Sequence, residues 1–122
     1  MKDTKTEILN IVSKIENEII EARQKLHENP ELSGEEFKTA DFICEYLSKI
    51  KVKYRKNIAG CGVMAEIFGE KSSAEKMSDS VSAQTEPKTV LFRADVDALP
   101  VCEAADVPYK SKIDGVMHAC GH

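Results

Sequence analysis

Residues 89–100 of the chain read TVLFRADVDALP, and this stretch decides how the rest of the sequence is interpreted. Its first part is a nearly continuous apolar run, which is typical of a central β-strand that is covered on both faces. We therefore predict a strand over residues 88–94. Two carboxylates, Asp95 and Asp97, follow this strand directly. In open α/β sheets ligands bind beyond the carboxyl ends of the strands, so we expect the functional site here.

A second polar group closes the sequence, because residues 115–122 read GVMHACGH. Cys120, His118 and His122 supply a thiol and two imidazoles, which together with carboxylates are the side chains that bind zinc and similar divalent ions. Cys120 and His122 alone are a modest signal, because alternate residues of an extended segment point to opposite faces. Both reach one ion only if Gly121 permits a bend. The alternative is a buried thiol beside a surface histidine.

Two helices are predicted in the first half of the chain. Apolar residues recur at three- and four-residue steps over residues 5–28, and Asn29-Pro30 ends this helix because the residue before a proline avoids the α region. His27 lies in the last turn, where an imidazole favours the helix dipole or caps carbonyls. Residues 33–36, Ser-Gly-Glu-Glu, form a predicted capping box that opens a second helix over residues 34–50. Cys44 lies on the buried stripe of that helix.

The periodicity then changes to that of strands. Short strands are predicted over residues 52–54 and 63–68, with a turn at residues 60–62 between them. Residues 70–87 are rich in Ser, Glu and Lys, so we predict a mobile loop that cannot bury enough apolar surface to become ordered. Two helices followed by strands indicate an α/β fold. We expect an α/β sandwich with a mostly parallel central sheet, of which this sequence is an N-terminal, truncated part.

Composition excludes several classes of partner. With 17 Lys and Arg against 21 Asp and Glu, the net charge is −4, which argues against nucleic acid or an anionic membrane surface. The N-terminus lacks the apolar core of a signal peptide, and no apolar run approaches the roughly 20 residues that span a bilayer. The sequence therefore predicts a cytoplasmic protein whose four cysteines are thiols.

Four motifs, in order, resemble those of the M20 metallopeptidase family, and in particular its amidohydrolase subfamily of aminoacylases, hippurate hydrolases and indoleacetyl-amino-acid hydrolases. They are residues 23–33 (RQKLHENPELS), residues 92–100 (FRADVDALP), residues 108–111 (PYKS) and residues 117–122 (MHACGH). Four ordered motifs are a much more specific signal than any one of them.

The resemblance implies a metal-dependent hydrolase that cleaves the amide bond of small N-acyl amino acids. It implies Cys120 and His122 as metal ligands and Asp97 as the acid that orients a ligand, whereas Asp95 and His118 receive no firm role. The implied cofactors are divalent ions (zinc, manganese, cobalt or nickel), two of them in the full-length enzyme. The family's general base, its other ligands and the lid domain used for dimerisation are expected beyond residue 122, with a homodimer or homotetramer as the full-length form.

Two other interpretations remain open from the sequence. Because the expected general base is not among these 122 residues, the chain is either part of an enzyme or a truncated, non-catalytic product with residual metal binding. Asp95 and Asp97 after a strand also occur as the nucleophile and acid of a phosphatase. Arg93-Ala94 before them and Ala98-Leu99-Pro100 after them do not fit that signature.

Overall fold

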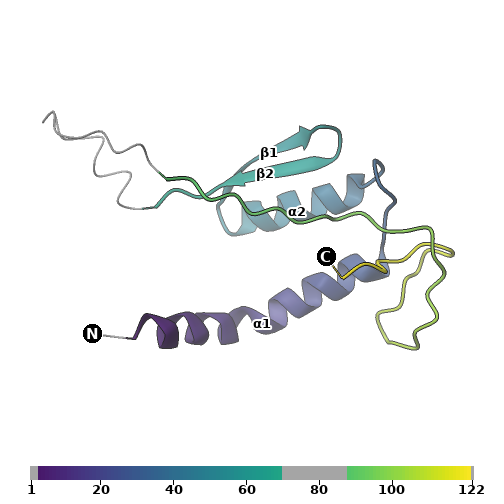
Figure 1. The fold of residues 1–122 in the computed structure, drawn as a ribbon, viewed down its shortest axis with the longest axis horizontal. Coiled ribbons are helices and arrows are strands. Elements are labelled where there is room, and N and C mark those ends of the chain that lie inside the picture. The colour runs from purple at the N-terminus through teal and green to yellow at the C-terminus, as the bar shows by residue number, and fades with distance from the viewer. Residues whose placement is uncertain (1–2, 70–87, 122) are drawn as a thin grey trace, which may run out of the picture. The chain divides into compact units, whose positions relative to one another are not determined.

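A computed structural model describes residues 3–69 and 88–121 of the chain. The order of elements is helix α1 (Thr4–Glu28), helix α2 (Phe37–Lys49), strand β1 (Lys53–Ile58) and strand β2 (Gly62–Glu66), as Figure 1 shows. The predicted mobile loop at residues 70–87 and the predicted ligand His122 lie outside the described residues. No helix in the described part of the chain is both long and apolar enough to cross a membrane.

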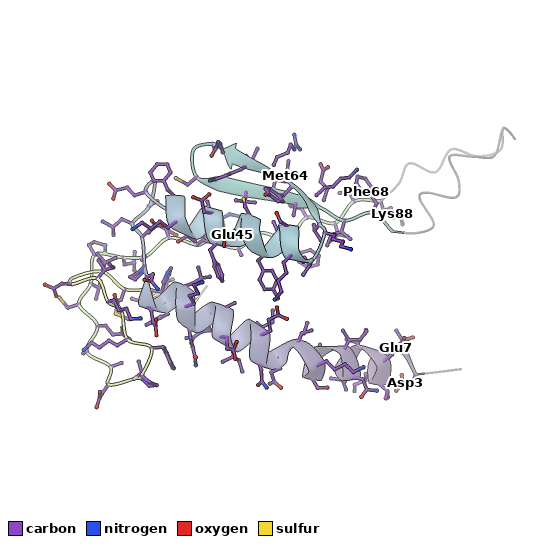
Figure 2. All side chains as sticks on the ribbon, turned by 180° about the vertical axis from the view of Figure 1, so that it is seen from behind. Asp3, Glu7, Glu45, Met64, Phe68 and Lys88 are labelled. Atoms are coloured by element: carbon purple, nitrogen blue, oxygen red, sulfur yellow. The ribbon has the colours of Figure 1, made fainter. Side chains whose placement is uncertain are left out.

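Helix α1 is confirmed almost to the residue. Asp3 caps its first turn, since the carboxylate accepts hydrogen bonds from the Lys5 amide at 3.2 Å and from the Thr6 hydroxyl at 2.9 Å. Asp3 and Glu7 lie together at this end (Figure 2), where negative charge complements the helix dipole. At the other end Asn29 donates from its side chain to the Lys25 carbonyl at 2.8 Å.

The apolar stripe of α1 is largely exposed to solvent in the structure. Its isoleucines keep between 42% and 55% of their surface accessible: Ile8, Ile11, Ile15 and Ile19. Only His27, near the C-terminal end of the helix, is buried. The periodicity therefore predicted the helix correctly, although the described residues do not cover its apolar face.

Helix α2 begins at Phe37, three residues later than predicted, and the predicted capping box is wrong. The carboxylate that caps the helix is that of Glu31, which accepts hydrogen bonds from the amides of Lys38 at 3.2 Å and Thr39 at 2.7 Å. Glu36 does reach back, but it accepts from the Gly34 amide at 2.8 Å. A carboxylate from outside the helix has thus replaced the Ser33 hydroxyl in this role.

The packing face of α2 is narrower than the sequence suggests. Ala40 and Cys44 are buried, as predicted for Cys44, whereas Phe37 and Ile50 are exposed. Phe37 is the first residue of the helix and Ile50 lies just beyond its last residue. Residues at the two ends of a helix have fewer neighbours to pack against than residues in its middle. Phe37 and Ile50 therefore stay exposed although they continue the apolar stripe.

Strands β1 and β2 form a two-stranded antiparallel hairpin, in which Lys53 pairs with Glu66 and Arg55 with Met64. The predicted strands were therefore right in kind, although β1 is longer than expected. Gly60 has a φ of +105° in the connecting turn, a conformation that a side chain disfavours. Figure 2 labels Met64 on β2 and Glu45 on α2, which locates the hairpin and the helix in that view.

The predicted central strand at residues 88–94 is not present. This segment has no regular secondary structure, and Val90, Leu91 and Phe92 expose 74%, 83% and 90% of their surface. A strand exists only through hydrogen bonds to a neighbouring strand, and no described residue pairs with this segment. The α/β character is confirmed, whereas the mostly parallel sheet stays a prediction.

By its contacts the chain divides into two compact units. The first comprises α1, the connection up to Thr39, and residues 96–121. The second comprises residues 40–69 and 88–95, which contain most of α2 and the hairpin. Within the second unit the Lys56 ammonium pairs with Asp41, and the Ser48 hydroxyl lies 3.1 Å from the Tyr54 hydroxyl. These contacts attach the hairpin to α2.

Candidate functional site

Two short pairings shape the segment that carries the polar motifs. Ala98 forms a parallel bridge with Leu32, and its amide donates to the Glu31 carbonyl at 2.8 Å. Leu99 forms an antiparallel bridge with Met117, with amide-to-carbonyl distances of 3.0 and 3.1 Å in the two directions. Residues immediately after Asp97 are thereby held beside residues immediately before His118. Two motifs about 20 residues apart in sequence meet in one place.

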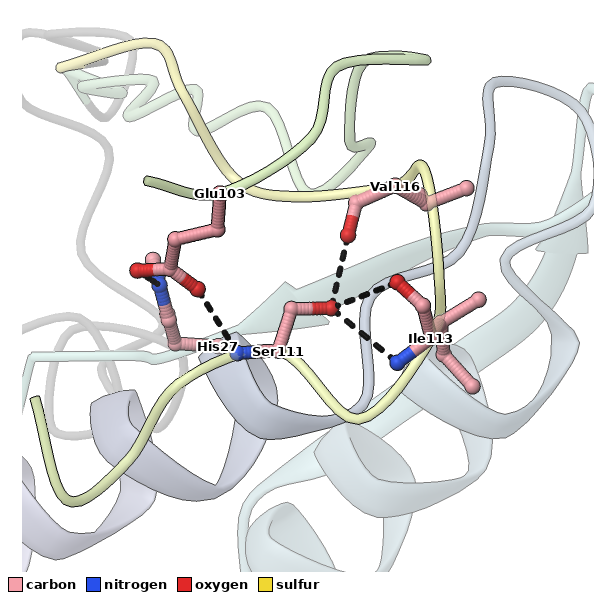
Figure 3. Close-up of polar contacts among 5 residues, drawn as sticks. All are labelled: His27, Glu103, Ser111, Ile113 and Val116. Carbon is pink, nitrogen blue, oxygen red and sulfur yellow. Dashed lines mark hydrogen bonds and ion pairs between the residues drawn. The ribbon is translucent and has the colours of Figure 1, made fainter. Parts of the chain in front are cut away.

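A buried polar cluster lies in the same unit, and Figure 3 shows its members. Glu103 is at its centre, with only 3% of its side chain exposed. Its Oε1 lies 3.0 Å from Nε2 of His27, and its Oε2 accepts a hydrogen bond from the Ser111 amide at 2.7 Å. These partners, with Lys110 nearby, lower the pKa of the Glu103 carboxyl, and the Ser111 amide is the largest cause.

The Ser111 hydroxyl closes the turn that follows. It donates to the Val116 carbonyl at 2.6 Å and lies within hydrogen-bond distance of both the amide and the carbonyl of Ile113, at 3.2 and 3.1 Å (Figure 3). Gly115, inside this turn, has a φ of +71°, which favours glycine. Glu103 is therefore connected to Val116 through one serine residue.

Aromatic rings pack around His27. The Tyr109 ring meets it edge-on, with 5.8 Å between ring centres, and the His118 ring is tilted against it at 6.1 Å. Arg23, one turn earlier on α1, lies over the Tyr109 ring at 5.7 Å. His27 was predicted to cap its helix or to favour the dipole. His27 does lie in the last turn of α1, as predicted, and its Nε2 in addition contacts Glu103.

His118 presents one ring nitrogen without a partner. Its Nε2 is buried and makes no hydrogen bond. The ring lies beside Asp97, whose backbone and carboxylate both favour the charged imidazole. Burial lowers the pKa of His118, His27 lowers it further, and Asp97 opposes this. The net effect is a pKa of His118 below its ordinary value, which favours the neutral imidazole that metal ions bind.

The predicted site residues differ in burial and do not all lie in the same unit. Asp97 is half-buried and lies with His118 in the first unit. Asp95 is exposed in the second unit, where its Oδ1 lies 2.6 Å from the Arg93 guanidinium. Cys120 is exposed, two residues after His118. The structure therefore brings Asp97 and His118 together.

The described residues include side chains of the types that bind divalent metals, but the structure does not gather a complete set of ligands. A thiol at Cys120 and a buried, unpartnered imidazole nitrogen at His118 are donors of the kind that transition metals prefer. Within residues 3–69 and 88–121, however, no three His, Cys, Asp or Glu side chains are close enough to hold an ion. The predicted pair of Cys120 with His122 involves a residue outside that part of the chain.

Sequence reasoning missed Glu103 and gave Ser111 no role. A signal for Glu103 was available, because residues 101–105 read VCEAA and place one carboxylate among small apolar residues. An isolated charge in such surroundings is either exposed or paired when buried. Which partner it takes could not be read, since His27 is 76 residues away in sequence.

Comparisons with known proteins find similarity to one peptidase family. Residues 91–122 match the model of peptidase family M20/M25/M40. Thermostable carboxypeptidase 2 of Saccharolobus solfataricus is 41% identical over 120 residues, which cover 98% of this chain and 27% of the relative. An N-acetyl-L-cysteine deacetylase of Bacillus subtilis is 40% identical over 111 residues, covering 91% of this chain and 23% of the relative. The chain thus spans about a quarter of the length of these relatives.

The fold agrees with a solved structure. The crystal structure of Bacillus subtilis YXEP protein, a dinuclear metal-binding peptidase of the M20 family, matches 89% of this chain with a TM-score of 0.72 and 34% sequence identity. The match covers 27% of YXEP. The resemblance to M20 proteins that the four motifs indicated is therefore confirmed by sequence and by structure.

Proposed function

We propose, starting from the membership of this chain in peptidase family M20/M25/M40, that the protein hydrolyses the amide bond of N-acyl amino acids with the help of divalent metal ions. The observation that carries the proposal is the family match over residues 91–122, which contains Asp97, Cys120 and His122. Within this segment Leu99 pairs with Met117, close to Asp97 on one side and to Cys120 on the other.

Support for the substrate class comes from two relatives. The name of one describes removal of an acetyl group from N-acetyl-L-cysteine, and the name of another describes a carboxypeptidase. Both activities break a C–N amide bond beside an amino acid that carries a free carboxylate. An N-acyl amino acid contains both features, so it is the simplest substrate that satisfies both comparisons.

In this proposal Cys120 and His122 hold the metal, which can be zinc, manganese, cobalt or nickel, with two ions in the complete enzyme. A bound divalent ion supplies polarisation of the amide carbonyl and activation of water at neutral pH. Asp97 orients a neighbouring ligand through its carboxylate. The His118 ring, anchored on the Asp97 backbone, keeps this carboxylate's segment in place beside residues 117–121.

We extend the proposal to the setting of the enzyme. A net charge of −4 supports a small-molecule substrate and argues against nucleic acid or membrane as a partner. A cytoplasmic location and a homodimeric or homotetrameric full-length form complete the proposal. Gel filtration with light scattering of the complete gene product that contains these 122 residues tests the oligomeric state.

The function is tested on that complete gene product. After removal of metal with a chelator, we expect no hydrolysis of N-acetyl amino acids, and recovery when zinc, manganese, cobalt or nickel is added back. N-acetyl-L-cysteine and N-acetyl derivatives of apolar amino acids form the substrate panel, and p-nitrophenyl phosphate is the comparison. If the protein hydrolyses the phosphate ester but none of the N-acetyl amino acids, this proposal is wrong and the phosphatase-like use of Asp95 and Asp97 takes its place.

A further inference from the structure

We propose that Glu103 is a positioning residue for the metal-binding segment: held by His27, it fixes the turn at residues 111–116 and so sets where Cys120 presents its thiol. The inference rests on the proposed function, because it assumes that Cys120 binds metal. It concerns residues to which neither the sequence motifs nor the comparisons give a role.

The first step is the burial of the Glu103 carboxylate. With 3% of its side chain exposed, it has lost nearly all of its hydration and depends on protein partners. Each oxygen has one: Oε1 is 3.0 Å from His27, and Oε2 is 2.7 Å from the Ser111 amide. His27 belongs to α1 and Ser111 to the motif segment, so the carboxylate connects a helix to that segment.

The second step runs from Ser111 toward the thiol. Ser111 bonds to the Val116 carbonyl at 2.6 Å, and the next residue, Met117, pairs with Leu99. His118 follows and bonds to the Asp97 backbone, and Cys120 lies two residues later. The Ser111–Val116 bond is partly buried, and the Leu99–Met117 pairing closes at 3.0 and 3.1 Å. A shift of the Ser111 backbone therefore displaces the segment on which Cys120 stands.

A nearby ion pair provides the internal comparison. Lys112 pairs with Glu28 and so joins the end of α1 to the same segment. Its side chains are 64% and 25% exposed, compared with 10% and 3% for His27 and Glu103. Exposed pairs contribute roughly 0 to 1 kcal/mol to stability and leave both side chains free to move. Only the buried pair combines a fixed geometry with direct contact to the Ser111 backbone.

The test measures Co²⁺ binding by the complete gene product, freed of other metals, through the near-ultraviolet charge-transfer band that a cobalt–thiolate bond produces. Three variants are compared with wild type: Glu103→Ala, Glu103→Gln and, as the matched control, Glu28→Gln. Thermal unfolding of each metal-free protein is recorded beside the titration. Hydrolysis of an N-acetyl amino acid by the cobalt-loaded protein supplies kcat and KM separately.

We expect Glu103→Ala to weaken Co²⁺ binding roughly 10- to 100-fold, as is typical when a residue that supports a ligand is lost, and to lower kcat more than it raises KM. Glu103→Gln keeps a carbonyl oxygen for the Ser111 amide, so it should recover most of the affinity. Glu28→Gln should stay within about twofold of wild type, because the pair it breaks is largely exposed.

The proposal is overturned if Glu103→Ala lowers the unfolding temperature while Co²⁺ affinity, band intensity and kcat stay at wild-type values. It is equally overturned if Glu28→Gln weakens binding as much as Glu103→Ala does. Should Glu103→Ala fail to fold, His27→Ala, which removes the other half of the buried pair, decides: weakened Co²⁺ binding by the folded variant supports positioning, and wild-type binding contradicts it. A wild-type protein without any thiolate band, or one that Cys120→Ser does not change, refutes the proposed metal site instead, whatever Glu103 does.

Discussion

His27 Nε2 and Glu103 Oε1 lie 3.0 Å apart in a buried contact, although 76 residues separate them in the chain. His27 is at the end of α1, and Glu103 belongs to the segment that follows Asp97. The pair therefore joins the first helix to the part of the chain that matches the M20 family. The pair is charged on both sides only when His27 is protonated.

The lowered pKa of Glu103 predicts acid sensitivity. The pKa of Glu103 in the folded protein lies below its ordinary value of 4.5. As pH falls, this carboxyl is therefore protonated in the unfolded chain before it is protonated in the folded protein. The stabilisation is thus complete above about pH 4.5 and is lost as pH falls through the lower, folded pKa. The Ser111 amide, His27 and Lys110 all face this carboxylate and favour its charged form.

Urea unfolding of the complete gene product at a series of pH values measures this effect. Glu103→Gln carries no titrating carboxyl, so the difference in unfolding free energy between wild type and this variant should be largest near pH 7 and shrink below pH 4.5. A difference that stays constant down to pH 3 would show that the charge of Glu103 contributes nothing to stability.

The hairpin turn supplies a prediction about stability alone. A methyl group added at Gly62 would lie 2.5 Å from the Ile58 carbonyl oxygen, which is a backbone atom and cannot move away cheaply. Gly62→Ala should therefore destabilise the protein by about 1–3 kcal/mol, the usual cost of overpacking. Gly69→Ala is the matched control, because a methyl group there meets nothing within 4 Å. Equal unfolding midpoints for the two variants in urea would contradict the prediction.

The sequence predicted local structure well and long-range pairing poorly. Periodicity and Asn29-Pro30 located α1, because helix hydrogen bonds and proline effects act between near neighbours. The strand expected at residues 88–94 failed because a strand depends on a partner, and apolar character alone does not supply one. The cap of α2 failed for a similar reason, since Glu31 reaches the helix from outside the local motif.

The candidate site shows the same division. Asp97 and His118 lie in motifs that the sequence singled out, and the structure brings them into contact. Glu103 was missed because its importance comes from burial against His27, and burial is a property of the folded chain. Ser111 belonged to a recognised motif, but its hydrogen bonds to Val116 and Ile113 depend on a turn that spacing alone does not define.

Replacement of Cys120 by serine tests the predicted metal ligand. A hydroxyl is a harder and weaker donor than a thiolate toward zinc or cobalt, so Cys120→Ser should weaken metal binding. The loss should exceed the roughly 10- to 100-fold effect expected of residues that only support a ligand. Cys102→Ser is the matched control, since Cys102 is also an exposed thiol in the same unit. Metal titration of both variants of the complete gene product, followed by chelator competition, measures the difference. Equal affinities would show that Cys120 is not a ligand.

Replacement of Asp97 by asparagine separates orientation of a ligand from binding of the metal. The substitution keeps the shape of the side chain and leaves the Asp97 backbone free to bond with His118, but it removes the negative charge. We expect Asp97→Asn to retain most of the bound metal while kcat on an N-acetyl amino acid falls roughly 10- to 100-fold. Asp106→Asn removes the same charge from an exposed position of the same unit and should leave both quantities near wild type. Metal content by atomic absorption and turnover on one substrate are measured for each purified variant. If Asp97→Asn strips the metal while Cys120→Ser leaves it bound, the two roles are reversed, because the carboxylate would then be the ligand and the thiol would not.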